Sequence, residues 1–440
     1  MTNFLSAIII FSCLLSNVAS AKTVALQDVL HEILNNSNVK KSAEYSLKAS
    51  EGEVLEADKH WLPTLYLDSS FYKTNDPTKN FIGNLYQRSI RQSDFEQNVI
   101  NKTANGTYSK SAVGVNLPLY EGGAGIANSE IAKNMVVAKK YDLKQVEINQ
   151  YAYATANYIA LVSLQEQKIR LKKIAKNIDE ILKKYALGNK KNQVGYSGLL
   201  ILQVSENKTK SFIIDNEEKT KALYATLREL GFASEIDWSV NNLPVNDYLN
   251  KYLKFELESD SSFKISALKA KVEADKNKEK IENGKNLPKL NLFAENYVFN
   301  GDRSTQNGYT AGLNLRWNFF DPLSYNAGSI ASNNSNSSRY EFLAQQQNER
   351  AEIEFLNSQI NALTQAVRLA SKNDELMFKN VVVSQELFKN GAIVASNLSD
   401  AIMKYLDNFV YFANAQMQLI DLYSKKVSKQ KIDINHVLNQ

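Results

Sequence analysis

The side chains that most often carry catalysis or bind metals are few in this chain and lie far apart. The three histidines, His31, His60 and His436, are well separated, and the only cysteine is Cys13, near the N-terminus. A Cys/His nucleophile pair or a zinc site needs several such side chains together. We therefore expect no enzymatic activity, no bound metal and no cofactor.

Three closely spaced glycines, Gly122, Gly123 and Gly125, superficially resemble a phosphate-binding loop. No Gly-Lys-Ser/Thr triplet follows them, so a nucleotide site is not expected. Their conformational freedom suits a change from strand to helix instead. Any energy-driven process must then take its energy from a partner.

Polar side chains that could line an aqueous passage occur at alternate positions of four segments. Strands are expected at about 65–74, 109–120, 290–299 and 309–319, because apolar and polar residues alternate there. Runs of about ten residues let a tilted strand cross the hydrocarbon core of a membrane. Two hairpins of a soluble sheet are the alternative. The polar face would carry Asn116, Asn314, Arg316 and Asn318. Aromatic residues lie near both ends of the strands, as membrane interfaces favour: Trp61, Tyr72, Tyr108, Tyr120, Tyr309, Trp317 and Phe320.

Glycine and proline are scarce, with 17 Gly and 6 Pro in 440 residues, which predicts long uninterrupted elements. Gly125–Gly188 and Gly328–Gly391 each bound a long stretch without either residue type, and the second pair repeats the first at a constant offset. Apolar positions in both stretches alternate between spacings of four and three, as in a coiled coil or a long helical bundle. A turn at 188–198 or at 391–397 and a returning helix would complete each hairpin.

The chain is therefore interpreted as two tandem repeats of helix, strand, strand, long helix and helix. The fold class is mainly α with transmembrane β-strands. The first repeat is expected to span 22–231 and the second 245–431, with a linker at 232–244 and a C-terminal tail at 432–440.

A signal peptide is expected at residues 1–21. The apolar run from Phe4 to Leu15 is too short to span a bilayer, and a small-x-small pattern follows it at Val18-Ala19-Ser20-Ala21. The alternatives are a buried or interfacial N-terminal helix and attachment of a lipid to Cys13.

Four spanning strands cannot stand alone in a bilayer, because the two edge strands would leave backbone N–H and C=O groups unpaired in hydrocarbon. Several copies must therefore close one barrel. A polar inner face would make that barrel a water-filled pore, and the long helices would extend it as a tube on one side. The residues thus predict an export conduit assembled from identical chains.

The order of these elements, given twice after a signal peptide, resembles the TolC family of outer membrane factors. So do Leu119-Tyr120-Glu121-Gly122-Gly123 at the first strand-to-helix junction, and Phe388 to Gly391 with Ser396-Asn397-Leu398 and Asp400-Ala401 at the second turn. The resemblance covers essentially all of 22–431. It implies a homotrimer with a twelve-stranded β-barrel through the outer membrane, in contact with its lipid, continued by a periplasmic α-helical coiled-coil tunnel.

The resemblance also implies a passive duct for tripartite efflux or type I secretion. Its partners would be a periplasmic adaptor protein and an inner-membrane transporter of the ABC or RND type. The adaptor contacts and the narrowing of the tunnel would lie at the helical turns, with Gly188, Lys190, Lys191 and Gly195 in the first and Gly391, Ser396 and Asp400 in the second.

Two departures from the family pattern affect these expectations. The first turn is several residues longer than the second and has no Asp at the place matching Asp400. Phe320-Asp321-Pro322-Leu323 replaces Tyr-Glu-Gly-Gly at the second junction. At the first turn we therefore expect adaptor contacts that differ from the usual arrangement in the family.

Each candidate site residue has a structural alternative. Repeated by threefold symmetry, Asp400 would place three carboxylates around a closing aperture; alternatively, it caps the returning helix. Lys190 and Lys191 would meet acidic groups of the adaptor or are simply solvated. Arg316 lines the pore or lies at an interface.

Two other functions are compatible with parts of the pattern. A periplasmic adaptor or coiled-coil scaffold without a membrane barrel would also need a long helical hairpin, but not duplicated strand pairs. A surface adhesin would use Asn75–Thr107 as a binding loop. Nucleic acid is not expected as a partner, because the net charge of +5 is spread along the chain.

Overall fold

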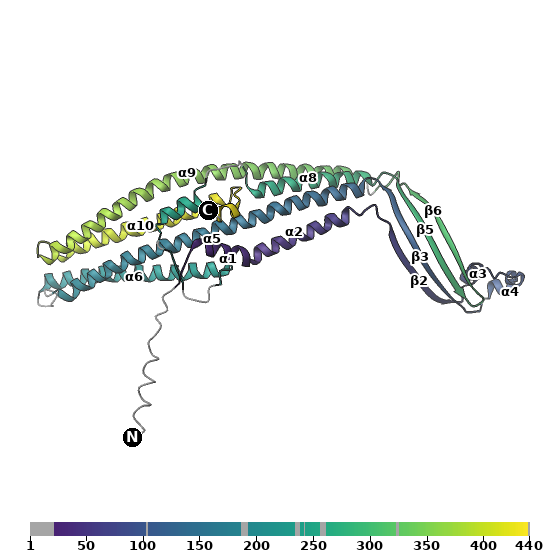
Figure 1. The fold of residues 1–440 in the computed structure, drawn as a ribbon, viewed down its shortest axis with the longest axis horizontal. Helices are drawn as coiled ribbons and strands as arrows, with labels where there is room; N and C mark the ends of the chain where they lie inside the picture. Colours follow the sequence, from purple (N-terminus) through teal and green to yellow (C-terminus); the bar gives the residue numbers. More distant parts are fainter. Residues whose placement is uncertain are drawn as a thin grey trace, which may run out of the picture. The chain divides into compact units, whose positions relative to one another are not determined.

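The computed structural model describes residues 22–102, 104–185, 192–233, 238–241, 243–255, 261–322 and 325–438. The expected signal peptide at 1–21, with Cys13, lies outside the described residues, as do Gly188, Lys190 and Lys191. The chain divides into two compact units (Figure 1). The helical unit comprises Met1–Glu44, Tyr141–Ile265 and Gln345–Gln440, and the sheet unit comprises Tyr45–Lys140 and Ser266–Ala344.

The sheet unit holds four long antiparallel strands near the four segments whose alternation predicted them. They are β2 (Thr64–Thr74), β3 (Gly106–Glu121), β5 (Lys289–Gly301) and β6 (Thr305–Arg316). Their order is β2-β3-β5-β6, so that β2 and β6 are the edges of the sheet in the described chain.

Strand β6 ends earlier than predicted, at Arg316. Arg316 pairs with Lys289, the first residue of β5. The residue before Lys289 is Pro288, which has no N–H with which to continue the ladder. Asn318 therefore lies beyond the sheet, and its assignment to the polar face of the strand is wrong.

The connection between β2 and β3 is folded. It contains α3 (Pro77–Tyr86), the 3-10 helix η1 (Gln92–Phe95) and α4 (Gln97–Asn101). The Asp76 side chain accepts hydrogen bonds from the backbone N–H groups of Thr78 and Lys79, which fixes the start of α3. The matching connection between β5 and β6 is a tight turn.

Two long helices, α5 (Ala124–Lys184) and α9 (Ala327–Lys389), contribute residues to both units. Each is followed by a returning helix, α6 (Gln193–Glu229) or α10 (Ala395–Val427), in the helical unit. The helices ahead of the strands are α2 (Asn38–Ala57) and α8 (Phe263–Gly284). No helix in the described part of the chain is both long enough and apolar enough to cross a membrane.

The first turn is shorter than predicted, because α6 begins at Gln193 and not after Gly198. The Asn192 side chain accepts a hydrogen bond of 3.1 Å from the Gly195 N–H and so caps the helix. Gly198 is buried within α6, where a Cβ would lie 2.8 Å from the Ala395 Cβ. Gly198 therefore marks close helix packing. By contrast, Gly391 has a φ of 71° and lies in the second turn.

The segment expected as a linker is packed into the helical unit. Its strand β4 (Trp238–Val240) pairs in parallel with β1 (Lys22–Val24). The Trp238 ring contacts those of Tyr224 and Phe232 at centroid distances of 4.8 and 5.0 Å. These contacts pack Phe232 and Trp238, two described residues of the connection, against the helical unit.

The remaining short elements complete the core of the helical unit. They are α1 (Leu26–Asn36), α7 (Val245–Tyr248), η2 (Leu249–Leu253) and α11 (Ile434–Leu438). Tyr158 of α5 is fully buried among them and donates a hydrogen bond of 2.7 Å to the Val24 carbonyl. The core thus joins β1 and α1 to elements of both repeats.

Candidate functional site

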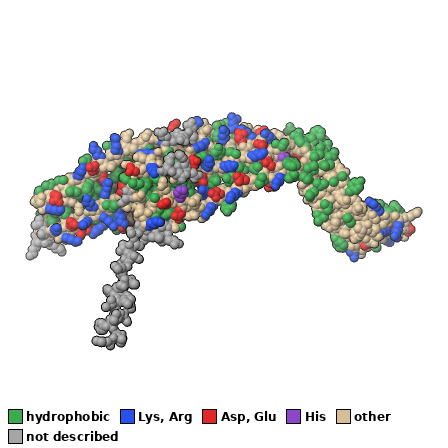
Figure 2. All heavy atoms as spheres, viewed as in Figure 1, with side chains coloured by type: hydrophobic (Ala, Val, Ile, Leu, Met, Phe, Trp, Pro, Cys, Tyr) green, Lys and Arg blue, Asp and Glu red, His purple; other side chains and the backbone are tan. Residues whose placement is uncertain are grey.

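One face of the sheet is apolar and exposed. The pairings Leu67↔Val113, Val113↔Asn296 and Asn296↔Tyr309 place alternate residues of all four strands on this face. Figure 2 shows hydrophobic side chains gathered over the strands. A contiguous exposed patch of this kind marks a surface that another apolar phase covers. We call it the apolar face; its large exposed side chains are Leu65, Leu67, Phe71, Val113, Leu292, Val298, Tyr309, Leu313 and Leu315.

The opposite face carries the charged and amide side chains, and we call it the polar face. Lys110 of β3 forms an ion pair of 3.0 Å with Glu295 of β5. Tyr66 of β2 donates a hydrogen bond of 3.1 Å to the other oxygen of the same carboxylate. This network crosses three strands on one side of the sheet. One face therefore suits water and the other suits an apolar phase.

Three of the predicted pore residues lie on the polar face. Asn116 is opposite Phe293, Asn314 is opposite Asn291, and Arg316 is opposite Lys289, all in register with Glu295. Their shared face is the arrangement that the period-two pattern predicted.

Four cross-strand pairs of an aromatic residue and a glycine lie on the polar face, and the sequence reasoning missed them. A Cβ on any of these glycines would meet the ring opposite it. Glycine in a strand interior often marks such a close approach, in which a ring covers the glycine of the next strand. The pairs are Tyr66↔Gly114, Tyr108↔Gly301, Phe293↔Gly312 and Tyr297↔Gly308.

Two of the aromatic residues expected at a membrane interface point elsewhere. Tyr72 and Tyr108 lie on the polar face with ring centroids 5.6 Å apart, and Tyr108 is buried. The expectation is wrong for both, because α3 covers that part of the sheet. Trp61, Tyr120, Trp317 and Phe320, at the other end of the strands, are exposed.

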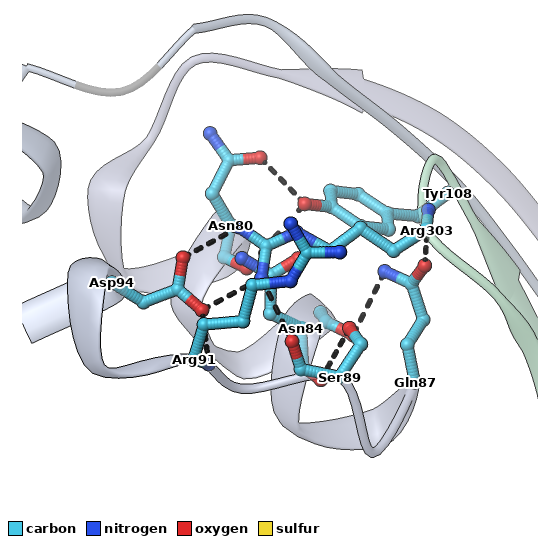
Figure 3. A network of polar contacts seen from close by, with 9 residues as sticks. Asn80, Asn84, Gln87, Ser89, Arg91, Asp94, Tyr108 and Arg303 are labelled. Carbon is cyan, nitrogen blue, oxygen red and sulfur yellow. Dashed lines mark hydrogen bonds and ion pairs between the residues drawn. The ribbon is translucent and has the colours of Figure 1, made fainter.

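Helix α3 packs on the polar face at the end of the sheet (Figure 3). The Tyr108 hydroxyl donates a hydrogen bond of 2.9 Å to the Asn80 side chain. The Tyr86 ring stacks on Phe299 at 5.0 Å, and Gly83 lies directly over the Tyr108 ring. These contacts bury Tyr108 and Phe299 beneath the helix.

An ion pair fixes the chain after α3 to the turn between β5 and β6. Two nitrogens of the Arg303 guanidinium each donate a hydrogen bond of 2.6 Å to the Asp94 carboxylate (Figure 3). These bonds lower the pKa of Asp94 to about 2. The Gln87 side-chain carbonyl accepts hydrogen bonds of 2.8 Å from the backbone N–H groups of Arg303 and Ser304.

The described ends of the two helical hairpins border a groove in the helical unit. Its volume is about 1280 Å³, and both hairpins line it. The rings of Tyr185 and Phe388 lie 5.6 Å apart within it. Gly195, Gly391 and Ser396, predicted from the two separate turns, all line this groove.

Asp400 does not line the groove. Its carboxylate forms an ion pair of 2.8 Å with Lys404, one helical turn further on, and both side chains are exposed. The N-cap of α10 is Val394, so Asp400 does not cap the helix, and that alternative is wrong. It remains an exposed carboxylate near the start of α10.

An ion pair between a half-exposed arginine and a buried aspartate links α5 to α9. The Arg170 guanidinium donates to the Asp374 carboxylate, whose side chain is only 2% exposed. Burial raises the pKa of Asp374, and burial also raises the pKa of Tyr405 on α10, which lies close to this pair. A charge in the apolar seam of the heptad pattern was the sequence signal for this site.

Two further polar contacts join the returning helices. The Ser205 and Ser399 hydroxyls are hydrogen-bonded at 2.6 Å, and Lys208 pairs with Asp407 at 2.7 Å. These two contacts hold α6 and α10 side by side.

Helix α9 carries an exposed apolar stripe. Phe355, Leu369, Leu376 and Val383 lie at multiples of seven residues, and each is more than half exposed, at 61%, 59%, 54% and 55%. Heptad positions form the seam between packed helices. The stripe therefore fits a further helix beyond those of its own chain.

Comparison with known proteins gives a fold but no sequence relative: no protein family and no curated protein matches the chain. The CmeC outer membrane channel of Campylobacter jejuni is 15% identical, with a TM-score of 0.73 over 94% of this chain and 89% of that one. The VceC outer membrane protein of Vibrio cholerae is 14% identical, with a TM-score of 0.70 over 92% of this chain and 96% of that one. The MtrE outer membrane channel of Neisseria gonorrhoeae is 13% identical, with a TM-score of 0.72 over 92% of this chain and 88% of that one. The chain has the fold of outer membrane channels.

The expected resemblance to the TolC family of outer membrane factors is thereby confirmed at the level of the fold. The structural agreement covers most of this chain and most of each compared chain, so it includes both repeats. In this outer membrane channel fold, the polar face of the sheet and the groove at the turns are the two surfaces that gather the predicted site residues.

Proposed function

We propose that the chain is the outer membrane channel of a tripartite efflux pump or a type I secretion system. It would act as a passive conduit from the periplasm to the exterior. The observation that carries this proposal is the two-faced sheet, with exposed leucines and aromatics on one side and the Lys110–Glu295 network on the other. Such a sheet is stable when lipid covers the first face and water covers the second.

A homotrimer with a twelve-stranded barrel follows from the edges of the sheet. In hydrocarbon, the outer edges of β2 and β6 would each leave backbone groups without hydrogen bonds. Pairing β2 of one copy with β6 of the next satisfies both edges and closes the ring. Three copies, as in the family that the chain resembles, give twelve strands. Asn116, Asn314 and Arg316 would then line the pore.

The helical hairpins would extend the pore as a periplasmic coiled-coil tunnel. Neighbouring copies would cover the exposed stripe of Phe355, Leu369, Leu376 and Val383 on α9. Burying a leucine side chain contributes on the order of 2 kcal/mol, so a stripe of this length supports assembly.

The groove at the turns is the proposed contact for the periplasmic adaptor. It combines the Tyr185 and Phe388 rings with Gly195, Gly391 and Ser396, and thus offers a recess that is partly lined by aromatic rings. Asp400, exposed on the same hairpin, would add a carboxylate near the aperture. An ABC or RND transporter in the inner membrane would supply the energy.

Cell fractionation and native mass measurement test the proposal. We expect the mature protein in the outer membrane fraction, extracted by detergent as a trimer. Deletion of the gene should increase sensitivity to exported drugs or abolish secretion of a peptide or protein. A soluble periplasmic monomer would contradict the proposal and favour the adaptor or scaffold alternative.

A further inference from the structure

We propose that α3 and the segment after it occupy the outer mouth of the channel and contact the same segment of the other copies. This inference rests on the proposed function, because it needs the closed ring. We call residues 77–102 the mouth segment. Its partner surface is the mouth segment of a second copy of this chain.

The position of α3 on the sheet is the first argument. In a closed ring, the apolar face must meet lipid, so the polar face lines the lumen. Helix α3 packs on the polar face, through Gly83 and Asn80 against Tyr108 and through Tyr86 against Phe299. The mouth segment is therefore folded over the lumen side of the strands.

The polarity of α3 is the second argument, because it is the reverse of that of an ordinary surface helix. Asn80, Gly83 and Gln87 are buried on the side toward the sheet. Ile82 and Leu85 are 43% and 50% exposed on the other side. Phe95 of η1, which packs edge-to-face on Phe81 at 5.6 Å, is 58% exposed and enlarges this surface.

The connection of the mouth segment to the edge strand β2 indicates which molecule covers the exposed side of α3. The mouth segment follows directly from β2, the edge strand that the next copy would pair with. Around a threefold axis, segments that fold toward the lumen converge on one another. The exposed Ile82, Leu85 and Phe95 side chains would then meet their counterparts and be removed from water.

Anchoring is the third argument. The Asp94–Arg303 ion pair, the hydrogen bonds of Gln87 and a bond of 3.0 Å from Arg88 to the Asn307 carbonyl tie the mouth segment to β6 and the turn before it. Arg303 also donates a hydrogen bond of 2.9 Å to the Ser89 carbonyl. Held at several points, the segment stays over the lumen and narrows it.

Single-channel conductance of the purified full-length trimer in planar lipid bilayers tests the inference. Replacing residues 77–102 with a short Gly-Ser linker should raise the conductance at least twofold. Asp94→Ala and Arg303→Ala, which release the anchor, should raise it or add fast fluctuations. Lys278→Ala, which removes the exposed ion pair of 2.8 Å with Asp275 on α8, is the matched control and should leave the conductance unchanged.

Oxidative cross-linking provides a readout that does not depend on the deletion variant folding. Leu85→Cys should give disulfide-linked dimers, whereas Phe71→Cys, 77% exposed on the apolar face, should remain monomeric on denaturing gels. Unchanged conductance in the anchor variants together with no Leu85→Cys dimers would overturn the inference. Absence of any channels from the membrane-inserted wild-type protein would instead overturn the proposed function.

Discussion

At the scale of single residues, four glycines make room on the polar face of the sheet for four large aromatic rings. Tyr66, Tyr108, Phe293 and Tyr297 each lie across from a glycine of the next strand. A polar face crowded with aromatics would have no room for additional Cβ atoms. The Lys110–Glu295 ion pair lies on the same face, with the Lys110 ammonium 5.0 Å from the centre of the Tyr297 ring.

Gly114→Val tests this packing. A Cβ at this position would overlap the Tyr66 ring, and overpacking of this kind costs about 1–3 kcal/mol. We expect the trimer to dissociate at a lower temperature on semi-native gels. Gly52→Ala is the control, because nothing lies within 4 Å of a Cβ there, and an alanine in helix α2 should be neutral or stabilising. Equal effects of both substitutions would contradict the packing argument.

Asp374→Asn tests the Arg170–Asp374 ion pair through its pH dependence. Burial raises the pKa of Asp374 above its ordinary value, so the folded state favours the protonated carboxyl. The protonated Asp374 carboxyl therefore stabilises the folded state at pH values below its ordinary pKa. This stabilisation is lost as the pH rises through the raised pKa. Relative to wild type, the Asn variant should therefore gain thermal stability between about pH 4 and neutral pH. A constant difference across that range would refute this assignment.

Residue positions were predictable from the sequence where a regular period fixed them. Alternation placed Asn116, Asn314 and Arg316 on one face, because a strand has a period of two. The Asp94–Arg303 pair was not predictable, since the two residues lie in different repeats and meet only after the mouth segment folds. Asn318 was misplaced because alternation continues past the point where Pro288 ends the ladder.

At the scale of elements, the hairpins are the parts that the sequence predicted best, apart from their first turn. Scarce Gly and Pro and the four-three spacing located α5 and α9 closely. Gly198 was read as a turn residue, yet it lies inside α6 against Ala395. A glycine that allows close helix packing and one that ends a helix look alike in a single sequence.

Gly198→Leu tests the close packing of α6 on α10. The new side chain must separate the two helices and so disrupt the Ser205–Ser399 hydrogen bond of 2.6 Å. We expect a loss of about 1–3 kcal/mol in the free energy of unfolding, seen as a lower thermal midpoint. Gln203→Leu, at an exposed position of the same helix, should change little. Similar midpoints for the two variants would show that α6 and α10 tolerate separation.

At the scale of the whole molecule, one chain exposes surfaces that only assembly or a membrane can cover. These surfaces are the two sheet edges, the apolar face and the stripe on α9. Their presence in one chain supports a ring of identical copies in lipid. The number of copies comes from the resemblance, because the geometry of one chain does not fix it.

Leu369→Asp with Leu376→Asp tests the assembly. Both leucines are more than half exposed in the single chain and would be buried by a neighbour, where a carboxylate is costly. Native mass measurement at matched concentration should show a shift from trimer to monomer. Lys379→Gln, which removes an exposed ion pair on the same helix, should stay trimeric. Intact trimers in the double variant would place the interface elsewhere.

The central claim, that one face of the sheet meets lipid and the other meets water, is tested most directly by cysteine accessibility along β6. Single cysteines at Thr310, Ala311, Leu313 and Asn314 would be treated with a charged maleimide in protein reconstituted into lipid vesicles. We predict labelling at 310 and 314, on the polar face, and protection at 311 and 313, on the apolar face. Equal labelling of all four positions, or protection of 310 and 314 alone, would contradict the account.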